Sequence, residues 1–182
     1  MAMGVRKKED THAEQQGNFV DHFIQVRRVT KVTKGGKRFS FSALVVSGDQ
    51  NGKVGVGLGK SREVSSAIAK ATNKARKTLV EVALRGVTLP YNVIGKHGAT
   101  SVILRSASKG TGVIAGGAVR SIMEALGVRD VLAKSLGASN RLNVVKATFN
   151  ALAQLRSLNS IARLRGKSIE QIMKGSHHVS AQ

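Results

Sequence analysis

Apolar residues and glycines alternate along residues 53–60, which is the two-residue period of a β-strand. From residue 61 onward the apolar residues recur at intervals of three and four, which predicts an amphipathic helix running to about residue 82. The predicted apolar stripe of this helix consists of Val64, Ala67, Ile68, Ala71, Ala75, Leu79 and Val82. Because the strand glycines leave one face without side chains, we expect another backbone to approach that face closely.

Two further strands are predicted upstream of this one. Residues 23–33 are rich in Ile, Val and Thr, and residues 38–47 place Phe39, Phe41, Ala43 and Val45 on one face. The Gly35-Gly36 pair between them indicates a hairpin turn. The alternation breaks at Arg27 and Arg28, which we interpret as a β-bulge. The first half is therefore predicted to be a three-stranded antiparallel sheet followed by a helix.

Strand and helix patterns alternate in the second half, which predicts an α/β unit of βαβα order with parallel pairing. A strand over 87–94 is interrupted by Pro90, residues 95–98 form a predicted turn, and a clearer strand follows at 100–107. A glycine-rich loop then leads to a helix that should end at Gly127, with Val119, Ile122, Met123 and Leu126 as its stripe. Another strand is predicted at 128–136. The last long helix, at 140–155, would bury Val145, Phe149, Leu152 and Leu155.

These patterns give a two-domain α+β organisation. Residues 1–18 are polar and are predicted to form a disordered arm. A first domain at 19–82 and a second at 90–159 are joined by a linker at 83–89. Residues 160–182 are predicted to be a basic tail, in which a capping box at 168–171 opens a short helix.

Charge narrows the class of partner. The chain carries 30 Lys and Arg against 10 Asp and Glu, so its formal charge is +20, which favours a polyanion: nucleic acid, an anionic membrane surface or an acidic protein. No apolar run approaches the roughly 18 residues of a spanning helix. The N-terminus does not resemble a signal peptide, and cysteine is absent, so we expect a cytosolic protein. Aromatic residues make up 3%, which argues against base stacking on single strands and favours recognition of folded RNA by backbone and shape.

The candidate RNA-binding residues fall into three groups. The first strand and its hairpin contribute Arg27, Arg28, Lys31, Lys34, Gly35, Gly36, Lys37 and Arg38. The turn between the glycine strand and the helix contributes Lys60 and Arg62, where backbone N–H groups could also meet a phosphate. The helix contributes a row formed by Lys70, Lys74 and Lys77. Since no acid at i+4 offsets this row, we favour RNA contact over a merely solvated face.

Two glycine-rich loops resemble nucleotide-binding or phosphate-binding loops in part. The loop at 55–61 fails the P-loop pattern at Val54 and the dinucleotide fingerprint at Lys60. The loop at 110–118 is compatible with a small-molecule phosphotransferase. That chemistry also needs a carboxylate for magnesium and a base, and the acids of this half lie outside the loop, at Glu124, Asp130 and Glu170. The five histidines lack metal-site spacing and are predicted to be exposed: His12, His22, His97, His177 and His178. We therefore predict no enzyme, no cofactor and no metal.

Four long motifs, at 32–41, 55–64, 110–120 and 143–148, occur in an order that resembles the bacterial-type small-subunit ribosomal protein S-five family. The similarity covers about residues 19–175. It implies a first domain like double-stranded-RNA-binding domains without their usual first helix. It also implies a second α/β domain of a kind found in small-molecule kinases and in a translocation factor.

The same resemblance implies a function. The chain would be a structural constituent of the small subunit of the cytoplasmic ribosome that binds 16S rRNA, contacts ribosomal proteins S-four and S-eight, and supports decoding accuracy. Residues 34–38 match the loop that reaches toward the subunit neck and the spectinomycin site. Gly112 and Arg120 match the face turned to S-four. Neither a membrane nor a second copy of the chain is an expected partner. The alternatives are the phosphotransferase and a free duplex-RNA-binding regulator.

Overall fold

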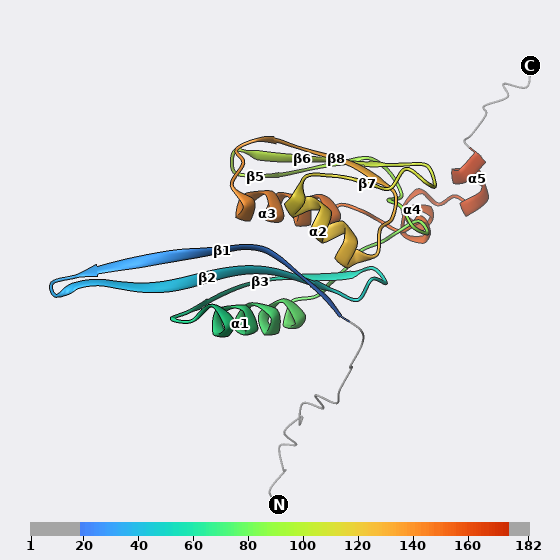
Figure 1. Ribbon diagram of the computed structural model, residues 1–182. Helices are drawn as coiled ribbons and strands as arrows, with labels where there is room; N and C mark the ends of the chain where they lie inside the picture. Colours follow the sequence, from blue (N-terminus) through green and yellow to red (C-terminus); the bar gives the residue numbers. More distant parts are fainter. Residues whose placement is uncertain (1–18, 175–182) are drawn as a thin grey trace, which may run out of the picture.

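A computed structural model describes residues 19–174 and has four layers (Figure 1). Helix α1 (Val64–Lys77) covers one face of a first sheet, and α2 (Gly117–Leu126) and α3 (Arg141–Leu152) lie between this sheet and a second one. The predicted two-domain α+β class is confirmed. Within the described residues, no helix combines the length and the apolar character needed to cross a membrane.

The first sheet is antiparallel, with strands in the order β1-β2-β3-β4. It contains β1 (Val20–Thr33), β2 (Gly36–Gly48), β3 (Lys53–Ser61) and a short β4 (Val80–Glu81). The three predicted strands are present, but the helix ends at Lys77 instead of reaching residue 82. At Thr78 the chain leaves helical geometry, and the Thr78 hydroxyl donates to the carbonyl of Val56 on β3 at 3.2 Å. The following residues then pair with β3 as β4.

Glycines in β3 allow α1 to lie unusually close to the sheet. A Cβ atom added at any of the three would come within 2.2 Å of a helix carbonyl oxygen; the facing pairs are Gly55 with Ala75, Gly57 with Ala71, and Gly59 with Ala67. The alanines recur every four residues and the glycines every two, so the helix and strand periods match along the contact. The backbone that approaches the bare strand face is therefore the protein's own helix.

A β-bulge is present in β1, but not where the alternation of residues suggested. The register shifts between Phe23 and Gln25, which leaves Ile24 as the extra residue. Arg27 and Arg28 pair regularly with Ser42 and Phe41, so the predicted bulge at the arginines is wrong. Both arginines lie where the strand is exposed, so burial does not impose alternation there.

The second sheet has the order β5-β6-β8-β7 and contains β5 (Val93–His97), β6 (Thr100–Ser106), β7 (Val113–Ile114) and β8 (Val131–Gly137). Parallel pairing is confined to β7 and β8, while β6 pairs antiparallel with β5 and β8. The chain reverses direction after β6, so the two-residue β7, not the 100–107 strand, begins the crossover through α2. The predicted turn at 95–98 is largely strand, and the turn itself lies at residues 98–99.

One continuous hydrophobic core joins the two sheets through α2 and α3. Leu44 and Val46 of the first sheet and Val102 and Leu104 of the second belong to it. The predicted α2 stripe is buried as expected, and Gly127 ends the helix in the left-handed conformation with φ of 89°. Leu89, within the predicted linker, is only 1% exposed and is part of the same core.

Two short helices follow α3. Helix α4 (Leu158–Arg165) was not predicted, whereas the capping box before α5 (Ile169–Lys174) is confirmed. The Ser168 hydroxyl accepts a hydrogen bond from the backbone N–H of Gln171 at 3.3 Å, and the Gln171 side-chain oxygen accepts one from the backbone N–H of Ser168 at 3.1 Å. The expectations for residues 1–18 and 175–182 lie outside the described residues.

Candidate nucleic-acid interface

Strands β1 and β2 continue past the body of the protein as a two-stranded arm (Figure 1). Ala43 and Gly59 pair on the face covered by α1, so the neighbouring pair Ser42 and Lys60 faces the opposite side. Following the register outward from Ser42, the basic residues on this opposite side are Arg27, Lys31, Arg38 and Lys60. All four are exposed, and we call this set the basic face of the arm.

The other side of the arm is more apolar. Val26, Val32 and Phe39 are exposed there, and the Arg28 guanidinium carbon lies 4.8 Å from the centroid of the Phe39 ring. The register places Arg28 on the apolar side, and the cation–π contact holds its side chain against Phe39 there. Arg27 and Arg28 therefore point to opposite faces and do not form one basic site.

Lys34 and Lys37 lie at the tip of the arm, and both are exposed. The turn places Lys34 and Gly35 between the strands, and Gly36 has φ of +131°, a value that side chains resist. The Thr33 hydroxyl donates to the Gly36 carbonyl at 3.1 Å and closes the turn. The tip thus presents two cations on a short, ordered hairpin.

The lysine row of α1 lies on the other side of the first sheet from the basic face. Lys70, Lys74 and Lys77 are exposed, and within residues 19–174 none of them forms an ion pair. Arg76 lies on a different flank of α1, where its Nη2 is 2.7 Å from Asp21 Oδ2 and its guanidinium carbon is 5.4 Å from the Phe19 ring centroid. The structure therefore separates the candidate cations into two surfaces. Arg62, also exposed, lies just before α1.

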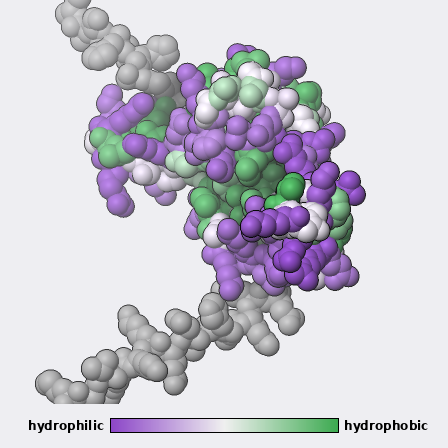
Figure 2. All heavy atoms as spheres, turned by 90° about the vertical axis from the view of Figure 1, so that its left-hand side faces the viewer, coloured by the Kyte–Doolittle hydropathy of each residue, from purple (hydrophilic) through white to green (hydrophobic). Residues whose placement is uncertain are grey.

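Figure 2 shows the face that carries the arm tip as mostly hydrophilic, with apolar residues gathered toward its middle. Hydrophilic residues therefore surround the apolar residues on this face. Contact with a polyanion over such a surface depends on shape and charge more than on one enclosed pocket.

The glycine-rich loop before α2 is closed by an internal carboxylate. Asp130 is 4% exposed, and its Oδ1 accepts hydrogen bonds from the backbone N–H groups of Gly110 and Gly112 at 3.0 and 2.9 Å. These donors are the groups that a phosphate cradle would offer to its ligand. Asp130 lies outside the loop in the sequence, so its role in closing the loop was not predicted. The one feature of the sequence that could have indicated this role is that Asp130 is among the few acids of a strongly basic half.

Gly112 and Arg120, predicted as protein-contact residues, lie at one corner. The Arg120 side chain donates to the carbonyl of Val113, the residue after Gly112, at 3.2 Å, and forms an ion pair with Glu124 at 3.3 Å. Gly112 adopts φ of +78°. The corner is therefore a left-handed glycine turn with a guanidinium folded against it.

Two further polar residues escaped sequence reasoning. His22 was predicted to be exposed, but its Nε2 is buried and has no hydrogen-bond partner among the described residues. Arg141 donates from Nη1 to the carbonyl of Ile24 at 3.1 Å, across 117 residues of sequence. Nothing in the local pattern around either residue indicates these environments, because both depend on a strand and helix brought together only by the fold.

The fold and its surfaces define the class of the protein: a two-domain α+β protein with exposed basic surfaces suited to a polyanion. Comparison with known families narrows this class. Residues 19–83 match the family described as Ribosomal protein S5, N-terminal domain, and residues 95–165 match Ribosomal protein S5, C-terminal domain. The chain belongs to the ribosomal protein S5 family.

Similar curated proteins agree with this assignment. The chain is 58% identical over 155 residues to the Small ribosomal subunit protein uS5 of Flavobacterium psychrophilum, covering 85% of this chain and 89% of the relative. It is 55% identical over 152 residues to the protein of the same name from Lawsonia intracellularis, covering 84% and 93%. For the Methylorubrum extorquens protein the identity is 52% over 167 residues, covering 91% and 87%.

Proposed function

We propose that this protein is a structural constituent of the small subunit of the cytoplasmic ribosome, where it binds ribosomal RNA and catalyses no reaction. The observation that carries the proposal is the match to both S5 domains, in order, along most of the chain. The charge of +20 and the exposed basic surfaces supply the physical basis, since cations placed against crowded phosphates release condensed counterions.

The proposed RNA contacts are divided between the two sides of the first sheet. On one side is the basic face of the arm, with Lys34, Gly35, Gly36 and Lys37 at its tip. On the other is the α1 row, with Arg62 close to the start of the helix. Arg28 contributes charge from the apolar side, stacked on Phe39. A protein gripped on both sides of a rigid sheet would hold two RNA segments at a fixed separation, which is a positioning role without base-specific reading.

The proposed protein partners are ribosomal proteins S-four and S-eight, with Gly112 and Arg120 at the contact with S-four and an influence on decoding accuracy. The geometry supports this use of the corner, because Arg120 remains 55% exposed although it is held by Val113 and Glu124. We also propose the division into domains at 19–82 and 90–159, with a linker at 83–89 and a basic tail at 160–182. The match at 19–83 supports the end of the first domain, and the separate match at 95–165 supports a second domain, although it extends into the first residues of the proposed tail.

The phosphotransferase alternative is disfavoured by the Asp130 carboxylate, which already occupies the loop amides. The free duplex-RNA-binding regulator remains a competing class. It differs from the ribosomal proposal in one direct observation: the ribosomal protein should sediment with small subunits at physiological salt, whereas the regulator should remain in the unbound fraction.

Salt-dependent binding to a folded fragment of small-subunit rRNA tests the contact surfaces. One variant carries Arg27→Gln, Lys31→Gln and Arg38→Gln, and another carries Lys70→Gln, Lys74→Gln and Lys77→Gln. A third changes Lys96, Lys134 and Arg156, three exposed cations of the second domain, and controls for the loss of charge.

The slope of log K against log salt should become shallower by roughly two to three units for each of the first two variants, somewhat under one unit per lost phosphate contact. The control variant should change it by less than about one unit. Equal changes in all three variants would mean that the protein is attracted by its net charge alone, and the surface assignment would be wrong.

A further inference from the structure

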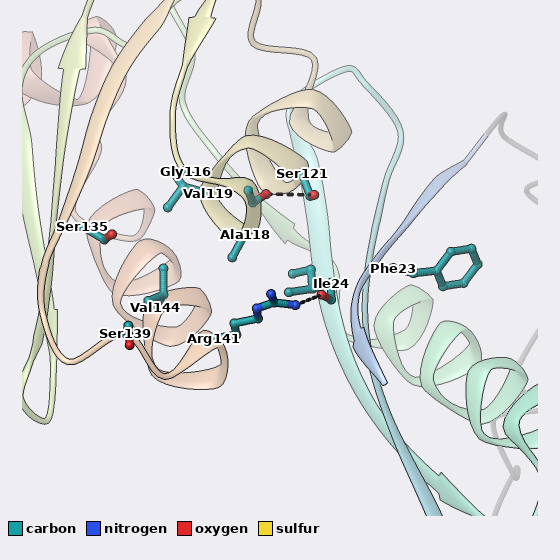
Figure 3. A pocket seen from close by; sticks show the side chains of 11 residues that line it. Phe23, Ile24, Gly116, Ala118, Val119, Ser121, Ser135, Ser139, Arg141 and Val144 are labelled. Carbon is teal, nitrogen blue, oxygen red and sulfur yellow. Dashed lines mark hydrogen bonds between the residues drawn. The ribbon is translucent and has the colours of Figure 1, made fainter. Parts of the chain in front are cut away.

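The bulge in β1 exposes a backbone carbonyl that the second domain captures. Ile24 has no partner in the β1–β2 register, because Phe23 pairs with Val45 and Gln25 with Leu44. Its carbonyl oxygen therefore lies outside the ladder. Arg141, the first residue of α3, donates from Nη1 to this oxygen at 3.1 Å (Figure 3). The bond is charge-assisted, which makes it stronger than a neutral pair.

This contact is distinctive within the described residues. Among their hydrogen bonds, it is the one that joins β1 to the second domain. A pocket of about 340 Å³ that opens to the surface adjoins it, lined by residues that include Ile24, Gly116, Ser139, Arg141 and Val144. The Ile24 side chain packs against the core and fixes the depth of the strand, while Arg141 holds its backbone from one side.

The contact lies at the base of the arm, so a small change there would move the tip of the arm by a larger distance. Beyond the bulge, residues 26–32 are all exposed, so none of these β1 residues is buried against the second domain. The eight residues from 26 to 33 span about 26 Å at roughly 3.3 Å per residue. A rotation of about 10° at the bulge would thus displace the tip by about 5 Å, more than the length of a hydrogen bond.

We propose that Arg141 is a positioning residue that sets the direction of the arm relative to the second domain. Its guanidinium braces the strand where it leaves the core, through a backbone oxygen of the bulged residue that the β1–β2 ladder leaves without a partner. The consequence for RNA rests on the proposed function: the arm would meet rRNA in one fixed direction. The brace itself is a property of the free protein.

Distance measurement in the free protein tests the brace. The chain has no cysteine, so spin labels can be attached uniquely at Val32→Cys near the tip and Lys146→Cys on α3, both exposed positions. Pulsed electron spin resonance would compare the parent with R141Q, R141K and a matched control, R156Q, whose side chain is exposed and forms no ion pair in the described structure.

The R141Q distance distribution should broaden or shift by several ångströms, with the far-ultraviolet circular dichroism unchanged. R141K retains a charged donor, whereas R141Q has only a neutral and shorter one, so R141K should lie between R141Q and the parent, and R156Q should match the parent. A distribution in R141Q that matches the parent, or an equal change in R156Q, overturns the proposal. Should R141Q lose its fold, R141K decides alone: a distribution identical to the parent in mean and width overturns the proposal, because the shorter, differently shaped side chain is expected to weaken the brace.

Binding to the rRNA fragment separates this inference from the proposed function. R141Q should weaken binding three- to tenfold relative to R156Q, with an equal salt slope, because the cations of the arm remain and only their placement changes. A parent protein that binds no rRNA but shows the distance change would retain the brace and reject the function. If the parent binds rRNA but R141Q leaves the distances unchanged, the proposed function is retained and the brace is rejected.

Discussion

Replacing Gly57 with alanine tests the close packing of α1 on β3. A Cβ atom at Gly57 would lie 1.9 Å from the Ala71 carbonyl oxygen, whereas ordinary contacts begin at 3.4 Å. The obstacle is helix backbone, so no side-chain rotation relieves it. Helix α1 would have to retreat by about 1.5 Å, the difference between these two distances.

That retreat separates the helix from the sheet along its buried edge. Overpacking a filled core costs about 1 to 3 kcal/mol, and a backbone obstacle places Gly57→Ala near the upper end, at about 3 kcal/mol. For a chain of this size the loss corresponds to a decrease in melting temperature of roughly 6 to 12 °C. Urea unfolding followed by circular dichroism measures the change in free energy directly.

Gly117→Ala is the matched control for this prediction. A Cβ atom there meets nothing within 4 Å, and the residue opens α2, where alanine is a better helix former than glycine. The control should leave stability unchanged or raise it by up to about 1 kcal/mol. If Gly57→Ala were no more destabilising than Gly117→Ala, the reasoning that glycine is required by the approach of α1 would be refuted.

Three further substitutions test other contacts. Asp130→Asn should lower stability by about 1.5 to 3 kcal/mol in urea unfolding and speed hydrogen exchange in the loop, because the charged acceptor of two amides is lost. Gly36→Ala should disturb the arm tip and cost about 1 kcal/mol because of its positive φ, while Gly35→Ala should leave amide chemical shifts at the tip almost unchanged. A double-mutant cycle between Arg76→Gln and Asp21→Asn should give a coupling of about 0.2 to 1 kcal/mol, since both side chains are partly exposed; a coupling above about 2 kcal/mol or of repulsive sign would refute this expectation.

The elements that sequence predicted well are those whose burial repeats with their own period. In α2, the residues at intervals of three and four are the buried ones, and Gly127 supplies the left-handed end that the pattern required. The strands at 38–47 and 53–60 were also found, because one face of each packs on α1 or the core. The capping box at Ser168 depends only on residues three apart, so it too was visible in the sequence.

Features that depend on distant partners could not be predicted in the same way. Helix α4 has only eight residues and buries none of them completely, so no core-facing stripe of useful length marks it in the sequence. The position of the bulge is set where β1 leaves the core at Ile24, not where the alternation breaks. Arg76 lies in the same helix as the lysine row, yet it forms an ion pair with Asp21, 55 residues earlier in the sequence. For the candidate RNA contacts, the sequence predicted which cations are exposed. It did not predict that they lie on two opposite sides of the first sheet.

The arm and the Gly112–Arg120 corner are connected through backbone hydrogen bonds between the β2–β3 turn and α2. Backbone N–H groups of Gln50 and Gly52, in the turn between β2 and β3, donate to the carbonyls of Ala125 and Leu126 at 3.0 and 3.1 Å. The turn of the first domain thus satisfies acceptors that the end of α2 would otherwise leave open. The same β2 that forms half of the arm is thereby tied to the helix that carries Arg120. Backbone hydrogen bonds of this kind resist movement of the β2–β3 turn relative to α2. The position of the arm therefore depends on α2 as well as on the Arg141 contact at β1.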